Sequence, residues 1–155
     1  MRLSVILAAV FMFITTGAFA AAPALPGCET VSVKTGKDSA KEISRLHGKE
    51  IEFESSYVAE YKCGNDPVII WASFSKTKDE AKSLFKLMDD KMPASQAFRN
   101  LMRMKTDGFD VAYVTGMGMD NYYFLDGKGN YWLAATGRDT FGLLKKLTGT
   151  LKQSR

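Results

Sequence analysis

Methionine is the residue type whose number and spacing suggest chemistry in this chain. Six of the eight methionines fall between positions 88 and 119, and they include the pairs Met102-Arg-Met104 and Met117-Gly-Met119. Thioether sulfur is a soft ligand that suits Cu(I), so Met117 and Met119 form a candidate metal site. Methionine also fills irregular cores and permissive binding surfaces. Core packing is favoured for the group, with an apolar contact surface and a copper site as the alternatives.

Residues for catalysis are few. His47 is the single histidine, and it comes just before Gly48 at the end of a predicted helix. An imidazole in that position can bind the terminal carbonyls of the helix and complement its dipole. No serine or cysteine stands in a nucleophile motif, and the glycine pairs lack the pattern of a dinucleotide or phosphate loop. The sequence predicts no catalytic residue and no cofactor, and it favours a binding protein over an enzyme.

Residues 1–20 have the three zones of a secretory signal peptide. Arg2 supplies the positive charge, an apolar stretch runs from Leu3 to Ile14, and Ala18-Phe19-Ala20 provides small residues for cleavage. The apolar stretch is shorter than the roughly 20 residues that span a bilayer. Cleavage after Ala20 is therefore favoured over a membrane anchor, and we expect an exported protein, periplasmic or secreted.

The two cysteines, Cys28 and Cys63, predict a disulfide. An even number of cysteines in an exported chain is typical of structural bridges, whereas redox-active pairs usually stand two residues apart. This bridge would close a loop of about 36 residues, which the chain-entropy model values at roughly 4 kcal/mol. A second possibility stays open, because Leu25-Pro26-Gly27-Cys28 is similar to a bacterial lipobox, in which Cys28 carries a lipid.

The composition describes a compact domain with little charge imbalance. The 155 residues are 46% hydrophobic, 12% aromatic and 25% charged, with 21 basic and 17 acidic side chains. These fractions exclude collagen-like, coiled-coil and disordered chains. The basic excess is too small and too dispersed to predict nucleic-acid binding. We expect a signal peptide at 1–20, an extended leader at 21–29 and a single α+β domain at 30–155.

Apolar periodicity predicts the elements of that domain. Alternating residues predict strands at 30–34, 50–54, 57–63, 109–115, 121–126 and 131–136, and an apolar run predicts a central strand at 68–74. Helical spacing predicts helices at 39–47, 77–92, 95–105 and 140–152. Ser39 and Thr77 each stand three residues before a glutamate, which is the spacing of a capping box.

These elements predict an α+β fold in which amphipathic helices pack an antiparallel sheet. Each half of the chain has the order helix, three strands, helix, and the segments 63–71 and 127–132 are similar to one another. Two pseudo-repeated α-β-β-β-α halves are therefore a further hypothesis, arising from an ancient duplication.

The predicted function is contact with another macromolecule, a protein or an envelope component. The candidate contact surface is the connection around 115–123, with Met117, Met119, Tyr122 and Tyr123. Basic side chains on the predicted helices at 95–105 and 140–152 make an anionic membrane surface a further possible partner, with no segment of the mature chain spanning it. The alternative function is a periplasmic Cu(I)-binding protein that uses the Met-x-Met pairs.

Overall fold

A computed structural model describes residues 21–155, so the predicted signal peptide at 1–20 lies outside the described residues. One antiparallel sheet has the strand order β1-β2-β3-β7-β6-β5-β4. The strands are β1 (Glu29–Thr35), β2 (Ser55–Cys63), β3 (Asp66–Phe74), β4 (Phe98–Thr106), β5 (Phe109–Gly116), β6 (Met119–Asp126) and β7 (Gly129–Ala135). The helices are α1 (Gly36–Leu46), α2 (Lys78–Lys91), α3 (Thr140–Gln153) and the short 3-10 helix η1 (Met92–Ala94). The predicted α+β class with an antiparallel sheet is confirmed.

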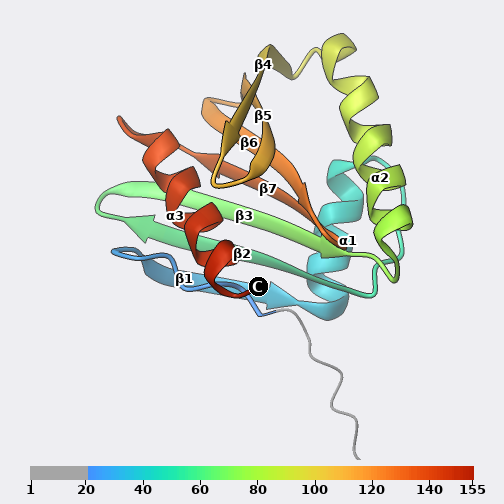
Figure 1. Cartoon of the computed structure of the whole chain (residues 1–155), viewed down its shortest axis with the longest axis horizontal. Coiled ribbons are helices and arrows are strands. Elements are labelled where there is room, and N and C mark those ends of the chain that lie inside the picture. Colours follow the sequence, from blue (N-terminus) through green and yellow to red (C-terminus); the bar gives the residue numbers. More distant parts are fainter. Residues whose placement is uncertain (1–20) are drawn as a thin grey trace, which may run out of the picture.

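One face of the sheet packs against α3 and holds most of the core (Figure 1). Successive side chains of a strand point to opposite faces, and on this face Tyr57, Ile70 and Leu133 are buried. Leu144 and Leu147 of α3 complete the layer and are also fully buried. This layer supports the sheet from behind the opposite face.

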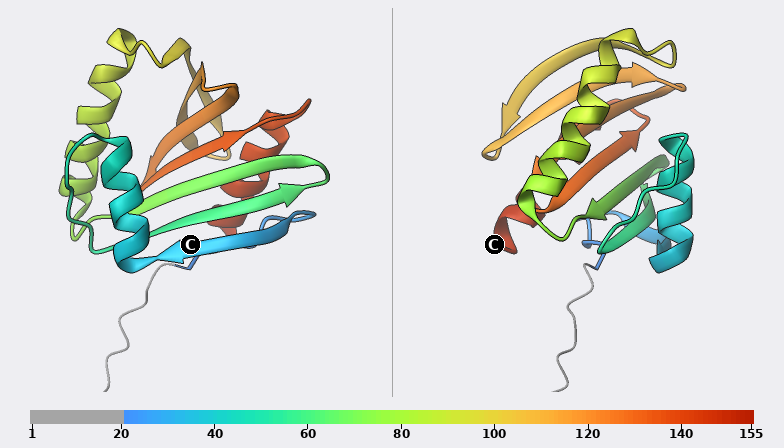
Figure 2. Two further views of the ribbon diagram at one scale, coloured as in Figure 1. Left: turned by 180° about the vertical axis from the view of Figure 1, so that it is seen from behind. Right: turned by 90° about the vertical axis from the view of Figure 1, so that its right-hand side faces the viewer.

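The opposite face of the sheet carries two helices (Figure 2). Helix α1 packs on β1, β2 and β3, whereas α2 packs on β6 and β7. The capping box predicted at Thr77 and Glu80 begins α2 and is confirmed. Further along α2, the Tyr123 hydroxyl of β6 donates a hydrogen bond of 2.7 Å to Asp89. Because the two helices pack on different strands, side chains of β3 and β7 form a floor between them.

The predicted disulfide is confirmed. Cys28 and Cys63 are joined by an S–S bond of 2.03 Å, which ties the leader to the end of β2. Leu25 of the leader is buried in the core, and the Tyr61 hydroxyl donates to the Pro23 carbonyl at 2.7 Å. Because the Cys28 sulfur is used in this bond, it has no place for a lipid. Disulfides are typical of proteins outside the cytoplasm.

None of the helices described within 21–155 is long and apolar enough to cross a bilayer.

The helix predicted at 95–105 is wrong. Residues 98–106 form β4, an edge strand that pairs with β5 and contains a β-bulge between Arg99 and Met102. The extra residue of a bulge interrupts the alternation of side chains. Phe98 and Leu101 therefore pack into the same cluster although they are three residues apart. That spacing is typical of a helix, and this explains the misassignment.

Three further predictions are corrected. The strand predicted at 50–54 is a loop, anchored where the Ile51 N–H donates to the Ser44 hydroxyl at 3.0 Å. Ser39 does not begin a helix, because α1 starts at Gly36 and the Ser39 hydroxyl bonds inward to Ser56 at 2.7 Å. The element order also differs from two α-β-β-β-α halves: the first half is β-α-β-β-α and the second is β-β-β-β-α.

Both edges of the sheet carry an irregularity. In β1 the pairing with β2 shifts between Thr30 and Ser32, and in β4 the pairing with β5 shifts between Arg99 and Met102. Each bulge leaves the outer strand locally bent and its hydrogen-bonding groups out of regular register.

Candidate functional site

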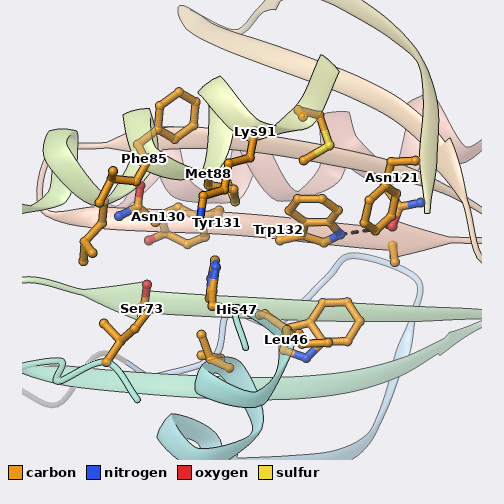
Figure 3. A pocket seen from close by; sticks show the side chains of 18 of the residues that line it. Leu46, His47, Ser73, Phe85, Met88, Lys91, Asn121, Asn130, Tyr131 and Trp132 are labelled. Carbon is orange, nitrogen blue, oxygen red and sulfur yellow. Dashed lines mark hydrogen bonds between the residues drawn. The ribbon is translucent and has the colours of Figure 1, made fainter. Parts of the chain in front are cut away.

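A groove of about 710 Å³ lies between α1 and α2, over the centre of the sheet (Figure 3). We call it the α1–α2 groove. Its floor is made by two cross-strand pairs of β3 and β7, Ile69 with Ala134 and Trp71 with Trp132. Small-molecule sites typically have volumes of about 300–1,000 Å³ and mostly apolar linings. The groove has the size and the character of such a site.

The walls of the groove come from both helices and from the loop after α1. Ile43 and Leu46 of α1 line one side, Phe85 and Leu87 of α2 line the other, and residues 51 and 53 of the loop are apolar. Leu46 is 61% exposed and Leu87 is 51% exposed, so the rim presents large apolar side chains to solvent. Contiguous exposed apolar surface is typical of an interaction site.

The two tryptophans of the floor are held in place through their indole N–H groups. Trp71 donates to a carboxylate oxygen of Glu42 at 3.2 Å, and Trp132 donates to the amide oxygen of Asn121 at 3.0 Å. Trp132 also stacks on Tyr123 with ring centroids 5.1 Å apart and planes 9° apart. With their polar atoms satisfied, both rings present rigid apolar surface to the groove.

Three basic side chains, His47, Lys49 and Lys91, belong to the lining, and no aspartate or glutamate does. His47 is the C-cap residue of α1, as its position in the sequence predicts, and its backbone N–H donates to the Ile43 carbonyl. In Figure 3 the imidazole points from the α1 side toward α2, where Lys91 lies. The apolar walls desolvate the imidazole, and with the positive charges of Lys49 and Lys91 they lower the pKa of His47.

The neutral polar side chains of the lining include Asn130, which stands beside Ser73 in the β3–β7 pairing. Its side-chain N–H donates to the Ala81 carbonyl of α2 at 3.1 Å. Its amide oxygen is buried and has no hydrogen-bond partner within residues 21–155. Such an acceptor is uncommon in folded proteins, where buried polar atoms are nearly always paired.

The structure divides the methionines between the two faces of the sheet. The four that line the groove are Met88, Met92, Met117 and Met119. Met104 instead packs against the core on the α3 side, and Met102 pairs with Tyr113 in the same sheet face. The candidate metal pair, Met117 and Met119, thus lies at the groove, separate from the other Met-x-Met pair.

Met117 occupies an unusual backbone conformation. It forms the tight turn between β5 and β6 with Gly118, at φ 55°, and its side chain is 78% exposed. Both central residues of such a hairpin turn require positive φ, which favours glycine, asparagine and aspartate. Methionine is disfavoured at positive φ, so Met117 lowers the stability of the fold. Its apolar side chain is exposed to solvent at the end of the groove.

The two tyrosines of the candidate contact surface are not at the surface. Tyr122 is 3% exposed and lies on the α3 face, whereas Tyr123 is fully buried on the groove face. Adjacent residues of β6 must point to opposite sides of the sheet. The contact surface that the sequence predicts is therefore reduced to Met117 and Met119, and its role stays a prediction.

In comparisons with known proteins, no family model, no curated protein and no solved structure matches this chain. The site is therefore interpreted from its own geometry.

Sequence reasoning did not find the groove residues Trp71, Trp132, Lys49 and Lys91. A signal for Trp71 was present, because 68–74 is apolar on both faces and must be covered on both. The spacing of α1 and α2 over the sheet is a property of the three-dimensional packing that no local pattern reports. Within residues 21–155, no group of three or more histidine, cysteine, aspartate or glutamate side chains is arranged to hold a metal ion.

Proposed function

We propose that this chain is an exported, non-catalytic binding protein of the bacterial envelope, and that the α1–α2 groove holds an apolar group of its ligand. The observation that carries the proposal is the open apolar groove of about 710 Å³ with Trp71 and Trp132 in its floor. Burial of apolar surface is worth roughly 25 cal/mol per Å², so a ligand that covers this floor and rim gains substantial free energy.

The side chains around the groove suit an adaptable site. Four methionines, Met88, Met92, Met117 and Met119, contribute to the lining. Methionine has three rotatable bonds and a polarizable sulfur, and it is enriched at permissive binding surfaces. The rigid indoles of the floor and the flexible thioethers of the rim together support binding of apolar groups of somewhat different shape.

The contact with a macromolecule that the sequence predicts is compatible with this site. A protein or envelope component reaches the groove by presenting an apolar side chain or alkyl chain to Met117 and Met119 at its end. The surface basic residues of α3 lie on the other face of the sheet (Figure 1), so they support a membrane contact independent of the groove.

The proposal is tested with a series of neutral alkyl ligands of increasing chain length. Trp71 and Trp132 are the only tryptophans of the chain, so a change in tryptophan fluorescence reports the groove alone. Each added methylene that enters the groove should tighten binding by about fourfold, which corresponds to roughly 0.8 kcal/mol. No saturable fluorescence change with any chain length would overturn the proposal.

A matched pair of variants identifies the site. Leu87→Glu places a charge on the groove rim, and Phe141→Glu makes the same change on α3, where the side chain is 43% exposed. Both positions are exposed helix positions, so both variants should fold. Leu87→Glu should weaken binding of the neutral ligands by tenfold or more (about 1.4 kcal/mol), and Phe141→Glu should leave it unchanged.

Binding of Cu(I) is the second candidate function. It is favoured by Met117 and Met119, whose side chains lie at one end of the groove with two further methionines in the same lining. Soft thioether ligands select Cu(I) over harder cations. Titration with Ag(I) as a redox-stable substitute should then shift the methyl resonances of Met117 and Met119 and not that of Met102.

A further inference from the structure

We propose that the ligand of the α1–α2 groove is an anionic amphiphile of the fatty-acid type, with its acidic head at Lys49 and Lys91 and its alkyl chain over Trp71 and Trp132. This inference rests on the proposed function, because it names the class of ligand for the same site.

The side chains of the groove lining that can carry a charge near neutral pH are all basic. Lys49, Lys91 and His47 contribute to the groove, and the lining contains no carboxylate. Within residues 21–155, neither Lys49 nor Lys91 forms an ion pair. Glu50 and Glu52 belong to the same loop as Lys49, but they are exposed and are not part of the lining. Positive charge beside the groove is therefore not compensated from within it.

Two carboxylates of the flanking helices, Glu42 of α1 and Asp89 of α2, already have partners. Glu42 forms an ion pair of 2.8 Å with Lys34 and accepts the Trp71 N–H. Asp89 forms an ion pair of 2.8 Å with Arg103 and accepts the Tyr123 hydroxyl. These bonds engage both carboxylates with partners other than the two lysines. An acidic head group is thus the partner that the lysines of the groove lack.

The arrangement of apolar and basic groups matches an amphiphile rather than a neutral oil. Ligand sites combine a mostly apolar lining with a few polar groups that fix orientation. Lysine keeps its ammonium group in water while its methylene stem lies along apolar surface. Lys49 and Lys91 can therefore hold an anionic head at the rim while the chain of the ligand runs down to the tryptophans.

The experiment compares three ligands that share one dodecyl chain and differ in head-group charge: dodecanoate, dodecyl maltoside and dodecyltrimethylammonium. Each is titrated below its micelle concentration into the full mature protein, and binding is followed by tryptophan fluorescence and calorimetry. Dodecanoate should bind about tenfold more tightly than the maltoside, and the cationic ligand should bind most weakly. The preference should decrease as salt is added, because the lysine heads are solvated.

Charge variants complete the test. The double variant Lys49→Gln, Lys91→Gln should lose about tenfold in dodecanoate affinity and keep its affinity for the maltoside. The matched control is Lys145→Gln, Lys152→Gln, which removes two exposed lysines from α3 and should change neither affinity.

The outcomes separate the inference from the proposed function. If the three ligands bind equally, or if the Lys49 and Lys91 variant binds dodecanoate as well as the unmodified protein does, the anionic ligand class is wrong and the apolar groove stands. If none of the three binds saturably, the proposed function itself fails.

Discussion

Trp71 and Trp132 stand directly opposite one another in the pairing of β3 with β7, yet their indole N–H groups are bound by different parts of the molecule. Trp71 donates to Glu42 of α1, and Trp132 donates to Asn121 of β6. The hydrogen bond of Trp71 thus links the floor of the groove to helix α1, whereas that of Trp132 links it to the neighbouring strand β6.

This difference predicts unequal effects of removing the two rings. Trp132 packs against Tyr123 and Phe98 with centroids 5.1 Å away in both pairs, whereas Trp71 makes no aromatic pair within residues 21–155. Trp132→Ala should lower the free energy of unfolding by about 3 kcal/mol, the low end for core aromatic residues, because Trp132 is partly buried. Trp71→Ala should cost about 1 kcal/mol, chiefly the hydrogen bond, and should weaken ligand binding instead. Urea denaturation followed by circular dichroism measures both, and equal losses of stability would contradict the distinction.

The disulfide should stabilise the fold measurably. Replacement of both cysteines, Cys28→Ser and Cys63→Ser, should lower the free energy of unfolding by roughly 2–4 kcal/mol, because the leader is no longer tied to β2 in the unfolded chain. Guanidinium denaturation with and without reducing agent gives the measurement. Reducing agent should destabilise the unmodified protein and leave the double variant unaffected.

The backbone at Met117 predicts a variant that gains stability and loses binding. Met117→Asn should stabilise the protein by about 1 kcal/mol, since asparagine tolerates the positive φ of this turn. The same change removes an apolar side chain from the end of the groove, so affinity for alkyl ligands should fall. Met102→Asn is the matched control, because Met102 is another exposed methionine that lies in β4 away from the groove. A gain in stability at both positions would show that the turn is not the cause.

The ion pair of Asp89 predicts how stability depends on acid. Desolvation opposes ionisation of this carboxyl, but the hydrogen bonds from Arg103 and Tyr123 outweigh it and lower the pKa of Asp89. A carboxyl with a lower pKa in the folded state stabilises the fold above its unfolded pKa, and this contribution is lost as the pH falls through the folded pKa. Stability should therefore decrease below about pH 4, with a smaller decrease in Asp89→Asn. Asp90→Asn, at the exposed neighbouring position, should show the decrease of the unmodified protein.

Much of the fold was accessible to pattern reading because its determinants are local. Alternation in 57–63 and 109–115 and the capping box at Thr77 each report on a few neighbouring residues, and the structure confirms them. The pattern failed at 95–105, where the meaning of Phe98 and Leu101 depends on a bulge that only pairing with β5 creates. It failed again at Ser39, which lies inside α1 and bonds to Ser56 of β2, a tertiary contact that the local pattern does not contain.

The candidate site was harder to predict from the sequence, because its residues are brought together by tertiary packing and not by local pattern. Met117 and Met119 were singled out by composition, and the structure places both at the groove. Tyr122 and Tyr123 were grouped with them by proximity in sequence, but the two faces of β6 separate them. Lys49 and Lys91 belong to segments 42 residues apart in sequence (91 minus 49), and only the tertiary packing brings them to one lining.

The bulges at the two outer strands limit how this molecule can associate. Regular unpaired strands invite a further strand from another chain, and a bent or bulged edge discourages that pairing. With Thr30–Ser32 distorted at one margin and Arg99–Met102 at the other, neither margin offers a straight template for β-augmentation. A binding partner should therefore contact a face of the sheet and not an edge strand. The protein should also resist aggregation by strand pairing at high concentration.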